Sequence, residues 1–312
     1  MNKSDSISVL GSTGLVGAAI VKHLQEVGYA NLYPNSSKIC NLLNSDDLNL
    51  HWNAIDNHTY CFFAAAKVGG IKANMDDPVG FGHDNMQIIL NVLKAAKVQS
   101  VKKLLYMGSS CIMPAACEQP MKEEHFMTGP FEPTNEMYAF SKAFGVRLCQ
   151  SYNKQYGTNF ISCQPCNIYG IGDNFDPNHS HVVSALIQKF HKAKMIGDKE
   201  VVCWGTGEAR REILYVDDLA DASIFLMNNY EEKDSFINVG TGEDHSIKEL
   251  AETVRDIVGY TGEILWDTSK PNGMLRKLLD VSKIHKLGWH HTTALKDGIE
   301  KTYNWWVLKE NL

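Results

Sequence analysis

Short apolar runs alternate with longer amphipathic stretches along the first half of the chain. The runs with the length and composition of strands are 7–10, 60–66, 104–107 and 160–164. The stretches with helical periodicity are 14–27, 84–97 and 134–156. Strands that alternate with helices predict an α/β fold, a doubly wound parallel sheet with helices on both of its faces.

The pattern becomes less regular after residue 170, where glycines mark several turns. One further strand is predicted at 237–239 and one further helix at 246–258. We therefore expect two parts, a nucleotide-binding domain over 1–170 and a smaller mixed α/β substrate-binding lobe over 171–312. Residues 213–240 are expected to return to the first domain.

Composition and charge exclude several classes of protein. Of the 312 residues 44% are hydrophobic, but no apolar run approaches the roughly 20 residues that span a bilayer. Residues 1–8 lack the apolar core of a secretory signal, so we expect a cytoplasmic protein with no membrane partner. The net charge is −6 and no basic tail or stripe is present, which argues against a nucleic-acid partner.

The eight cysteines are scattered, and several lie in apolar runs, as buried free thiols do in a reducing compartment. Cys163 and Cys166 form a C-x-x-C pair, which is typical of zinc or redox sites. No second pair or close histidine completes a ligand set, and the pair falls in a predicted strand. We therefore expect no metal.

A glycine-rich turn follows the first predicted strand and opens the first helix. Its G-x-x-G-x-x-G spacing comprises Gly11, Ser12, Thr13, Gly14, Leu15, Val16 and Gly17. Glycine allows a tight turn and a close approach of backbone N–H groups to a pyrophosphate, which the helix N-terminus also attracts. This context predicts a Rossmann-type dinucleotide site, although a plain turn between strand and helix has the same spacing.

The end of the second strand distinguishes NAD from NADP. An acid there binds the free ribose hydroxyl, whereas a cation binds the 2′-phosphate. Residues 33–38 contain no acid and one cation, Lys38. This composition favours NADP(H).

Tyr138 and Lys142 form a Tyr-x-x-x-Lys pair that shares one face of the helix predicted at 134–156. A neighbouring ammonium favours the phenolate, so we expect a lowered pKa for Tyr138, which would exchange a proton with a carbonyl or alcohol. Lys142 would stay positively charged and bind the cofactor ribose. Ser109, just after strand 104–107, would donate a hydrogen bond to the reacting oxygen. The pair alone is common on helices, and its combination with the glycine turn makes it specific.

Six longer segments carry a more specific signal. They are 64–71, 108–112, 173–175, 180–182, 204–207 and 276–280. On these segments the chain resembles, along essentially its whole length, the GDP-L-fucose synthases, a family within the extended short-chain dehydrogenases/reductases. The resemblance implies a homodimeric enzyme that epimerises GDP-4-keto-6-deoxy-mannose and reduces it with NADP(H).

The resemblance also implies roles for individual residues. Ser109, Tyr138 and Lys142 would form the reduction triad, and Cys111 and His181 the acid/base pair for epimerisation. The cofactor residues that it implies beyond the glycine turn are Ala65, Met107, Gly108, Lys142, Pro165, Asn167, Ile168 and His181. The substrate residues that it implies are Lys189, Trp204, Arg211 and Asn272.

Without the resemblance, other interpretations stay open for some of these residues. Cys111 is equally a small buried residue, His181 a surface histidine and Trp204 a core indole. Arg210 is an alternative to Arg211 as the ligand of the phosphates.

The chain departs from the family pattern at four places, which leaves the sugar open. Ser12-Thr13 stands where the family often has a basic residue, and Met113 stands where it often has Tyr. Cys166 stands where the family usually has Thr, and Asn272 stands where it commonly has Asp. Three other functions are compatible with the motifs: C4 reduction without epimerisation of another GDP-4-keto sugar such as a heptose, 4-epimerisation of a nucleotide sugar with recycled NAD, and non-catalytic NAD(P) sensing.

Overall fold

The computed structural model describes residues 1–55, 58–176, 180–270 and 272–310. Its larger part is a six-stranded sheet in which all neighbouring strands are parallel, in the order β2-β1-β3-β4-β5-β9. The strands are β1 (Ser6–Leu10), β2 (Leu32–Asn35), β3 (His58–Phe63), β4 (Lys103–Met107), β5 (Phe160–Pro165) and β9 (Ile237–Val239). The doubly wound parallel sheet predicted from the sequence is confirmed.

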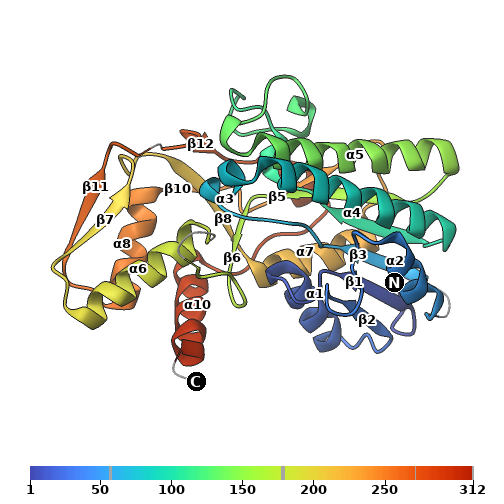
Figure 1. Ribbon diagram of the computed structural model, residues 1–312, viewed down its shortest axis with the longest axis horizontal. Helices are drawn as coiled ribbons and strands as arrows, with labels where there is room; N and C mark the ends of the chain where they lie inside the picture. Colours follow the sequence, from blue (N-terminus) through green and yellow to red (C-terminus); the bar gives the residue numbers. More distant parts are fainter. Residues whose placement is uncertain (56–57, 177–179, 271, 311–312) are drawn as a thin grey trace.

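Helices cover both faces of this sheet (Figure 1). On one side lie α1 (Leu15–Glu26) and α7 (Val216–Asn229), which contact each other. On the other side lie α4 (Pro78–Val98) and α5 (Glu136–Tyr156), with α2 (Ser45–Asn53) packed against α4. Strands β4 and β5 are buried along their whole length because both faces are covered. None of the helices in the described ranges combines the length and hydropathy that a membrane crossing requires.

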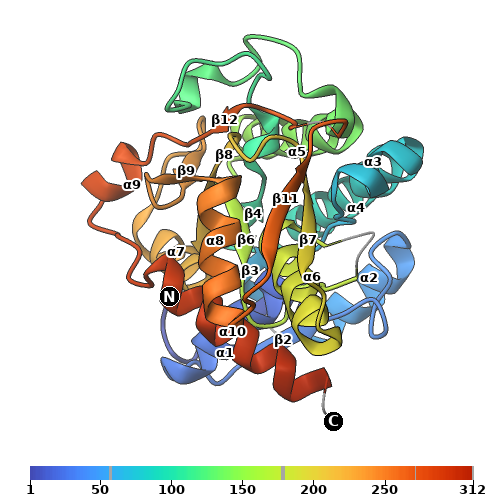
Figure 2. The same ribbon diagram turned by 90° about the vertical axis from the view of Figure 1, so that its left-hand side faces the viewer.

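A second, smaller part faces the viewer in Figure 2. It has its own hydrophobic core. Its strands are β6 (Asn167–Tyr169), β7 (Glu200–Trp204), β8 (Arg210–Tyr215), β10 (Asp244–Ser246), β11 (Glu263–Asp267) and β12 (Arg276–Lys277). Strand β8 pairs with β10, β12 and β6, and β7 pairs with β11. The helices that enclose this core are α6 (Val182–Ile196), α8 (Ile247–Val258) and α10 (Leu295–Glu310). The short helices α3 (Ile71–Asp76) and α9 (Ser282–Lys286) complete the α-helices of the described residues.

The boundaries of the helices follow local capping chemistry. Helix α4 begins at Pro78 rather than at residue 84, because the Asp77 side chain accepts the N–H of Gly80 and proline suits the first helical position. Helix α8 begins as predicted, with a capping box between Ser246 and Glu249.

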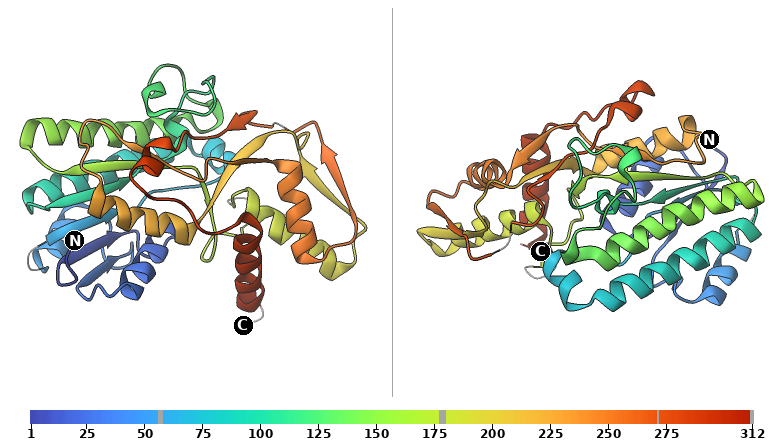
Figure 3. Two further views of the ribbon diagram at one scale, coloured as in Figure 1. Left: turned by 180° about the vertical axis from the view of Figure 1, so that it is seen from behind. Right: turned by 90° about the horizontal axis from the view of Figure 1, so that it is seen from above.

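The chain passes between the two parts more than once (Figure 3). It leaves the large sheet after β5 and enters the smaller part through β6, which pairs with β8. It then returns through α7, which packs on α1 and β4, and through β9, which pairs with β5. Segments of both parts therefore meet beside the carboxyl ends of β4 and β5.

Lys103 is a charged residue inside the main core, where it joins β4 to the end of α7. Its side chain is 3% exposed, and its Nζ donates to the carbonyls of Met227 over 2.9 Å and Tyr230 over 2.6 Å. The Nζ also pairs with the carboxylate of Glu231 over 2.8 Å. The ammonium satisfies carbonyls that a helix C-terminus leaves without intrahelical partners.

We predict that Lys103→Met lowers the free energy of unfolding by about 1–3 kcal/mol, because it leaves buried carbonyls without a donor. Denaturant unfolding monitored by circular dichroism measures this. The matched control is Lys102→Met at the exposed neighbouring position, which should change stability by less than about 0.5 kcal/mol. Equal effects of the two substitutions would contradict the role given to Lys103.

Candidate active site

The turn between β1 and α1 is packed so tightly that side chains are excluded at two positions. Gly11 has a φ of +86°, and a Cβ on it would lie 2.8 Å from the Cα of Ala65. A Cβ on Gly17 would lie 2.1 Å from the carbonyl oxygen of Gly11, so the first turn of α1 lies directly against the end of β1. Gly14 is the N-cap of α1 and provides no side-chain cap. This arrangement leaves the first N–H groups of the helix to an anion such as a phosphate.

The end of β2 lies beside this turn. The N–H of Ser12 donates to the carbonyl of Asn35, the last residue of β2, over 2.8 Å. Thr13 and Lys38 are exposed, so Lys38 offers a cation at this side of the turn. The two side chains of the turn that pack against the main core are Leu15 and Val16.

The other predicted cofactor residues lie at neighbouring strand ends. Met107 is the last residue of β4 and Gly108 follows it, Pro165 is the last residue of β5, and Asn167 and Ile168 lie in β6. Since parallel strands end at the same edge of a sheet, Met107, Gly108 and Pro165 share one edge with the glycine turn, and Asn167 and Ile168 follow Pro165 closely along the chain in the smaller sheet. This edge is where open α/β sheets bind their ligands.

The predicted reduction triad is assembled by β4 and α5. Tyr138 and Lys142 lie one turn apart on α5, and the Lys142 Nζ donates to the carbonyl of Met107 over 2.7 Å. This Nζ is 5.9 Å from the centroid of the Tyr138 ring. The hydroxyl of Ser109 interacts with the Tyr138 phenol and accepts the N–H of Cys111 over 3.2 Å. The structure thus brings Ser109, Tyr138, Lys142 and Cys111 together.

The protonation of Tyr138 differs from what the sequence predicts. Burial and the charge of the Cys111 sulfur raise the pKa of Tyr138, whereas we expected the Lys142 ammonium to lower it. The expectation is wrong because Lys142 is bonded to a backbone carbonyl, and burial lowers its own pKa to about 8. Tyr138 is therefore a neutral phenol near neutral pH, which is the form that donates a proton to a ketone oxygen.

Cys111 lies in a short 3-10 helix, Ser110–Ile112, with polar partners on two sides. Its Sγ accepts a hydrogen bond from the Nζ of Lys277 over 3.2 Å and from the Nδ2 of Asn135 over 3.3 Å. Burial raises the pKa of the Cys111 thiol, but the charge of Lys277 and the surrounding hydrogen bonds outweigh burial and hold the pKa below its ordinary value. Cys111 therefore has the surroundings of a reactive thiol rather than those of an inert core residue.

His181 lies on the side of the smaller part, at the N-cap of α6, and its side chain is exposed. Burial raises the pKa of Asp173, and the hydrogen bond from Ser184 and the positive charge of His181 oppose that rise. His181 is therefore within electrostatic range of Asp173. Within the described ranges, no hydrogen bond or ion pair joins His181 to Cys111.

The four predicted substrate residues lie around β7 and β8. The Lys189 Nζ donates to the carbonyl of Val202 in β7 over 2.7 Å. Trp204 ends β7 and is 57% exposed, so it is not a core indole. In β8, Arg211 donates from its Nη2 to the carbonyl of Asn272 over 3.1 Å. An exposed indole and a fixed guanidinium are groups that suit an aromatic base and phosphates.

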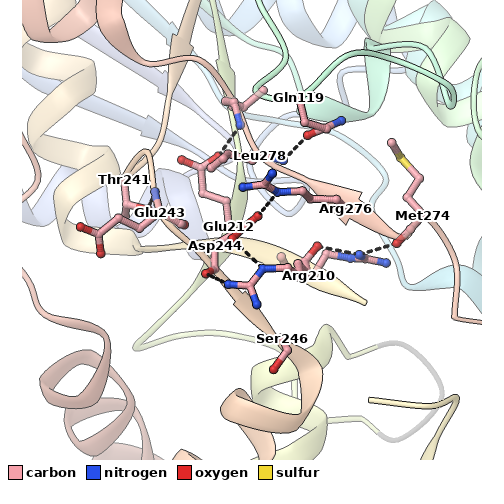
Figure 4. Close-up of polar contacts among 12 residues, drawn as sticks. Gln119, Arg210, Glu212, Thr241, Glu243, Asp244, Ser246, Met274, Arg276 and Leu278 are labelled. Atoms are coloured by element: carbon pink, nitrogen blue, oxygen red, sulfur yellow. Dashed lines mark hydrogen bonds and ion pairs between the residues drawn. The ribbon is translucent and has the colours of Figure 1, made fainter. Parts of the chain in front are cut away.

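The two neighbouring arginines of β8 have different surroundings, and Figure 4 shows those of Arg210. The Nε of Arg210 donates to the carboxylate of Asp244 over 2.8 Å, and Arg276 donates to the same carboxylate. Arg211 instead donates to backbone carbonyls, among them that of Met274 over 2.6 Å. Because Arg210 is already paired with the carboxylates of Asp244 and Glu249, Arg211 is the better candidate for a phosphate.

Glu212 is buried under these arginines and fixes the segment that follows β12. Its two oxygens accept the N–H of Gly242 over 2.8 Å and the N–H of Leu279 over 2.9 Å. Burial raises the pKa of Glu212 to about 7, and these two N–H groups oppose the rise. The contacts hold β12 in place beside β8.

The sequence motifs missed several polar residues that shape the site. They are Asn135, Gln164, Glu212 and Lys277. Their partners are distant along the chain: Lys277 is 166 residues from Cys111, and the Gln164 Oε1 accepts the N–H of Ser109, 55 residues away, over 2.6 Å. Lys277 does lie in 276–280, one of the segments that carry the family resemblance, which is the signal that could have identified it.

The C-x-x-C pair is built into the core. Cys163 lies in β5, where burial raises its pKa to about 12, and Cys166 is also buried. In the described part of the chain, no three His, Cys, Asp or Glu side chains form a group suited to a metal ion.

Comparisons with known proteins agree with this geometry. The model of the NAD dependent epimerase/dehydratase family matches residues 7–240, and the chain belongs to this family. GDP-L-fucose synthase 1 of Arabidopsis thaliana is 46% identical over 306 residues, which cover 98% of this chain and 94% of that protein. The resemblance to the GDP-L-fucose synthases predicted from sequence segments is thereby confirmed.

Two solved structures share the fold. A GDP-6-OMe-4-keto-L-xylo-heptose reductase from C. jejuni has a TM-score of 0.94 and 35% identity, with 99% of each chain covered. A GDP-L-fucose synthetase from Naegleria fowleri, bound to NADP, has a TM-score of 0.92 and 28% identity, with 100% of this chain and 96% of that chain covered.

We predict that Gly17→Ala weakens NADPH binding by roughly tenfold or more, because the added methyl group must push α1 away from Gly11 and a lost phosphate contact costs about 1.4 kcal/mol. Fluorescence titration with NADPH measures the Kd. Ala18→Ser, at the exposed neighbouring position of the same helix, is the control and should bind normally. Unchanged affinity of folded Gly17→Ala would show that the α1 N-terminus is not the dinucleotide site.

Proposed function

We propose that the chain converts GDP-4-keto-6-deoxy-mannose to GDP-L-fucose by 3,5-epimerisation and NADPH-dependent reduction of the 4-keto group. The observation that carries this proposal is the position of Cys111. A thiol whose pKa is lowered lies two residues from Ser109, whose hydroxyl interacts with the Tyr138 phenol. A base for C–H bonds and a donor to the ketone oxygen thus share one end of the sheet. The 46% identity to a plant GDP-L-fucose synthase supports the choice of substrate.

NADP(H) is the cofactor in this proposal, and when bound it supplies the hydride that reaches C4. The α1 N-terminus without a side-chain cap and the two positions that exclude a Cβ support the fit of a dinucleotide. The NADP bound to the Naegleria protein supports the phosphorylated form. The residues proposed to hold the cofactor are the glycine turn 11–17, Lys38, Ala65, Met107, Gly108, Lys142, Pro165, Asn167, Ile168 and His181.

Epimerisation requires proton transfer on both faces of the sugar ring. The carbons beside a ketone are acidic because the enolate places its charge on oxygen, where the hydroxyls of Tyr138 and Ser109 donate hydrogen bonds. Cys111 as thiolate removes the proton from one face, and His181 as imidazolium returns a proton on the other. The exposed position of His181 at the edge of the smaller part is compatible with approach from the opposite face.

Reduction uses the same hydroxyl groups. For reduction, Tyr138 would transfer its phenolic proton to the C4 oxygen, which becomes the hydroxyl of the alcohol. The raised pKa of Tyr138 keeps that proton in place until then. Lys142, held by the carbonyl of Met107, provides a fixed positive charge close to the phenol.

The nucleotide end of the substrate is assigned to the smaller part. Arg211 is proposed to bind a phosphate, Trp204 to pack on the guanine, and Lys189 and Asn272 to complete the site. We propose the same division for the chain as a whole: residues 1–170 bind the cofactor, and residues 171–312 mainly bind the GDP-sugar, with 213–240 returning to the first domain. The pairing of β9 with β5 and the packing of α7 on α1 support that return.

A homodimer formed through α4 and α5 is part of the proposal. These helices lie side by side on one surface of the molecule (Figure 3) and expose large apolar side chains. The most exposed are Val79 (76%), Val98 (63%), Tyr156 (51%) and Phe140 (50%). An apolar surface of this kind is typical of a protein interface. We also propose a cytoplasmic location, which eight free cysteines support.

A second candidate is C4 reduction of a GDP-4-keto-heptose without epimerisation. The observation in its favour is the C. jejuni heptose reductase, which has a TM-score of 0.94. Asn272, where the family frequently has Asp, leaves room for a different sugar.

We predict that the purified protein oxidises NADPH when GDP-4-keto-6-deoxy-mannose is added, and that GDP-L-fucose is the product. Absorbance follows the cofactor and NMR identifies the sugar. A product reduced at C4 without inversion at C3 and C5, or turnover only with a heptose substrate, would replace the proposal by the second candidate.

We predict that Cys111→Ser slows solvent-deuterium incorporation at C3 and C5 by roughly 100-fold or more, the usual contribution of a general base. NMR of the recovered GDP-sugar measures the exchange. The control is Cys117→Ser, which removes a partly buried thiol that contacts His125 instead. Undiminished exchange in Cys111→Ser would remove Cys111 from the mechanism.

A further inference from the structure

A lysine from the far end of the chain lies against the sulfur of Cys111. The Nζ of Lys277 is 3.2 Å from the Cys111 Sγ, and the Nδ2 of Asn135 is 3.3 Å from the same sulfur. We propose that Lys277 is a positioning residue that keeps Cys111 ionised, so that the thiolate is present before the substrate binds. This inference rests on the proposed function for its role in epimerisation, but the ionisation itself does not require a substrate.

The position of Lys277 is set by backbone contacts on both sides of it. Strand β12 pairs with β8 in a register that places Lys277 opposite Arg211. The next two residues are also anchored, because the N–H of Leu278 donates to the Gln119 Oε1 over 2.9 Å and the N–H of Leu279 donates to Glu212 over 2.9 Å. A flexible lysine side chain thus starts from a fixed backbone.

The alternation of side chains along a strand separates the two cations of β12. Arg276 pairs with Asp244, away from the sulfur, and Lys277 faces Cys111. The partner of the Lys277 ammonium at this site is a sulfur rather than a carboxylate. An ammonium next to a thiol favours the thiolate, which is how reactive cysteines are activated.

The other charged groups around the sulfur come from α5 and β8. The charge of the Cys111 sulfur contributes to raising the pKa of Tyr138. Burial lowers the pKa values of Lys142 and Arg211, and the charge of the sulfur opposes this lowering in both. Two cations besides Lys277 therefore lie within electrostatic reach of the sulfur. Lys277 differs from them because its Nζ contacts the sulfur directly.

The proton balance of the step follows from this pairing. The Cys111 thiolate takes a proton from a carbon beside the ketone, so an S–H bond forms as the C–H bond breaks and the electron pair moves to the carbonyl oxygen. Lys277 keeps its proton and does not touch the substrate. While the sulfur is ionised, its charge also holds the proton on Tyr138 that the later reduction needs.

The test measures the ionisation of Cys111 without substrate. Thiolate absorbance in the ultraviolet, as the difference between the wild type and Cys111→Ser, gives the titration curve of this one thiol. We expect Lys277→Met to move the curve to higher pH, and iodoacetamide alkylation of Cys111 at neutral pH to slow by roughly tenfold, because only the thiolate reacts. Lys277→Arg should restore the wild-type curve at least in part. The matched control is Lys286→Met, an exposed lysine on α9, which should leave the curve unchanged.

An unchanged curve in folded Lys277→Met would overturn the proposal. If that variant does not fold, alkylation of Cys111 and Cys117 in the wild type, compared by peptide mass spectrometry, tests the ionisation of Cys111 on which the inference depends. Burial and Glu118 raise the pKa of Cys117, so Cys111 must react at the lower pH. The opposite order contradicts the inference.

The same variant separates this inference from the proposed function. If the titration moves but the wild type exchanges no substrate protons, Lys277 controls the thiol and the proposed epimerisation fails. If the wild type forms GDP-L-fucose and the titration does not move, the function stands and the role of Lys277 fails. If the wild type forms GDP-L-fucose and the titration curve moves in Lys277→Met, the pH profile of deuterium exchange in that variant should shift to higher pH by the same amount as the thiol titration.

Discussion

Strands β1, β4 and β5 end at one edge of the large sheet. The backbone segments approach one another closely there, and this close approach sets the positions of the reactive groups. A Cβ on Gly11 would lie 2.8 Å from the Cα of Ala65, and one on Gly108 would lie 1.9 Å from the Oε1 of Gln164. The same Gln164 oxygen accepts the N–H of Ser109. The packing that excludes a side chain at Gly108 therefore also fixes the backbone that carries the Ser109 hydroxyl.

Features that depend on neighbouring residues could be predicted from the sequence. The glycine turn and the placement of Tyr138 and Lys142 on one helix face follow from spacing alone. The contact between Lys277 and Cys111 could not be predicted, because it joins a turn after β4 to a two-residue strand 166 residues later. The pKa of Tyr138 was predicted in the wrong direction for a similar reason, since burial depends on the whole fold.

In the proposed mechanism, the site keeps a base, Cys111, and an acid, Tyr138, close together without neutralising one another. An ionised Cys111 beside a neutral Tyr138 is stable only if the charge of the sulfur is balanced elsewhere, because transfer of the phenolic proton to the sulfur would remove both functions. The Lys277 ammonium provides that balance, and burial of Tyr138 disfavours its phenolate. The two proton transfers of the proposed reaction, one at carbon and one at oxygen, thereby use different groups.

These groups come from both parts of the molecule. Cys111 and Tyr138 belong to the large sheet domain, whereas Lys277 and Arg211 lie opposite each other in the sheet of the smaller part. The buried carboxylate of Glu212 binds the backbone at Leu279, so β12 cannot move from β8 without leaving a buried acceptor unpaired. In the proposed function, a sugar nucleotide bound through Arg211 would be placed by the same pair of strands that places Lys277 against the sulfur, which would couple recognition of the nucleotide to the position of the proposed base.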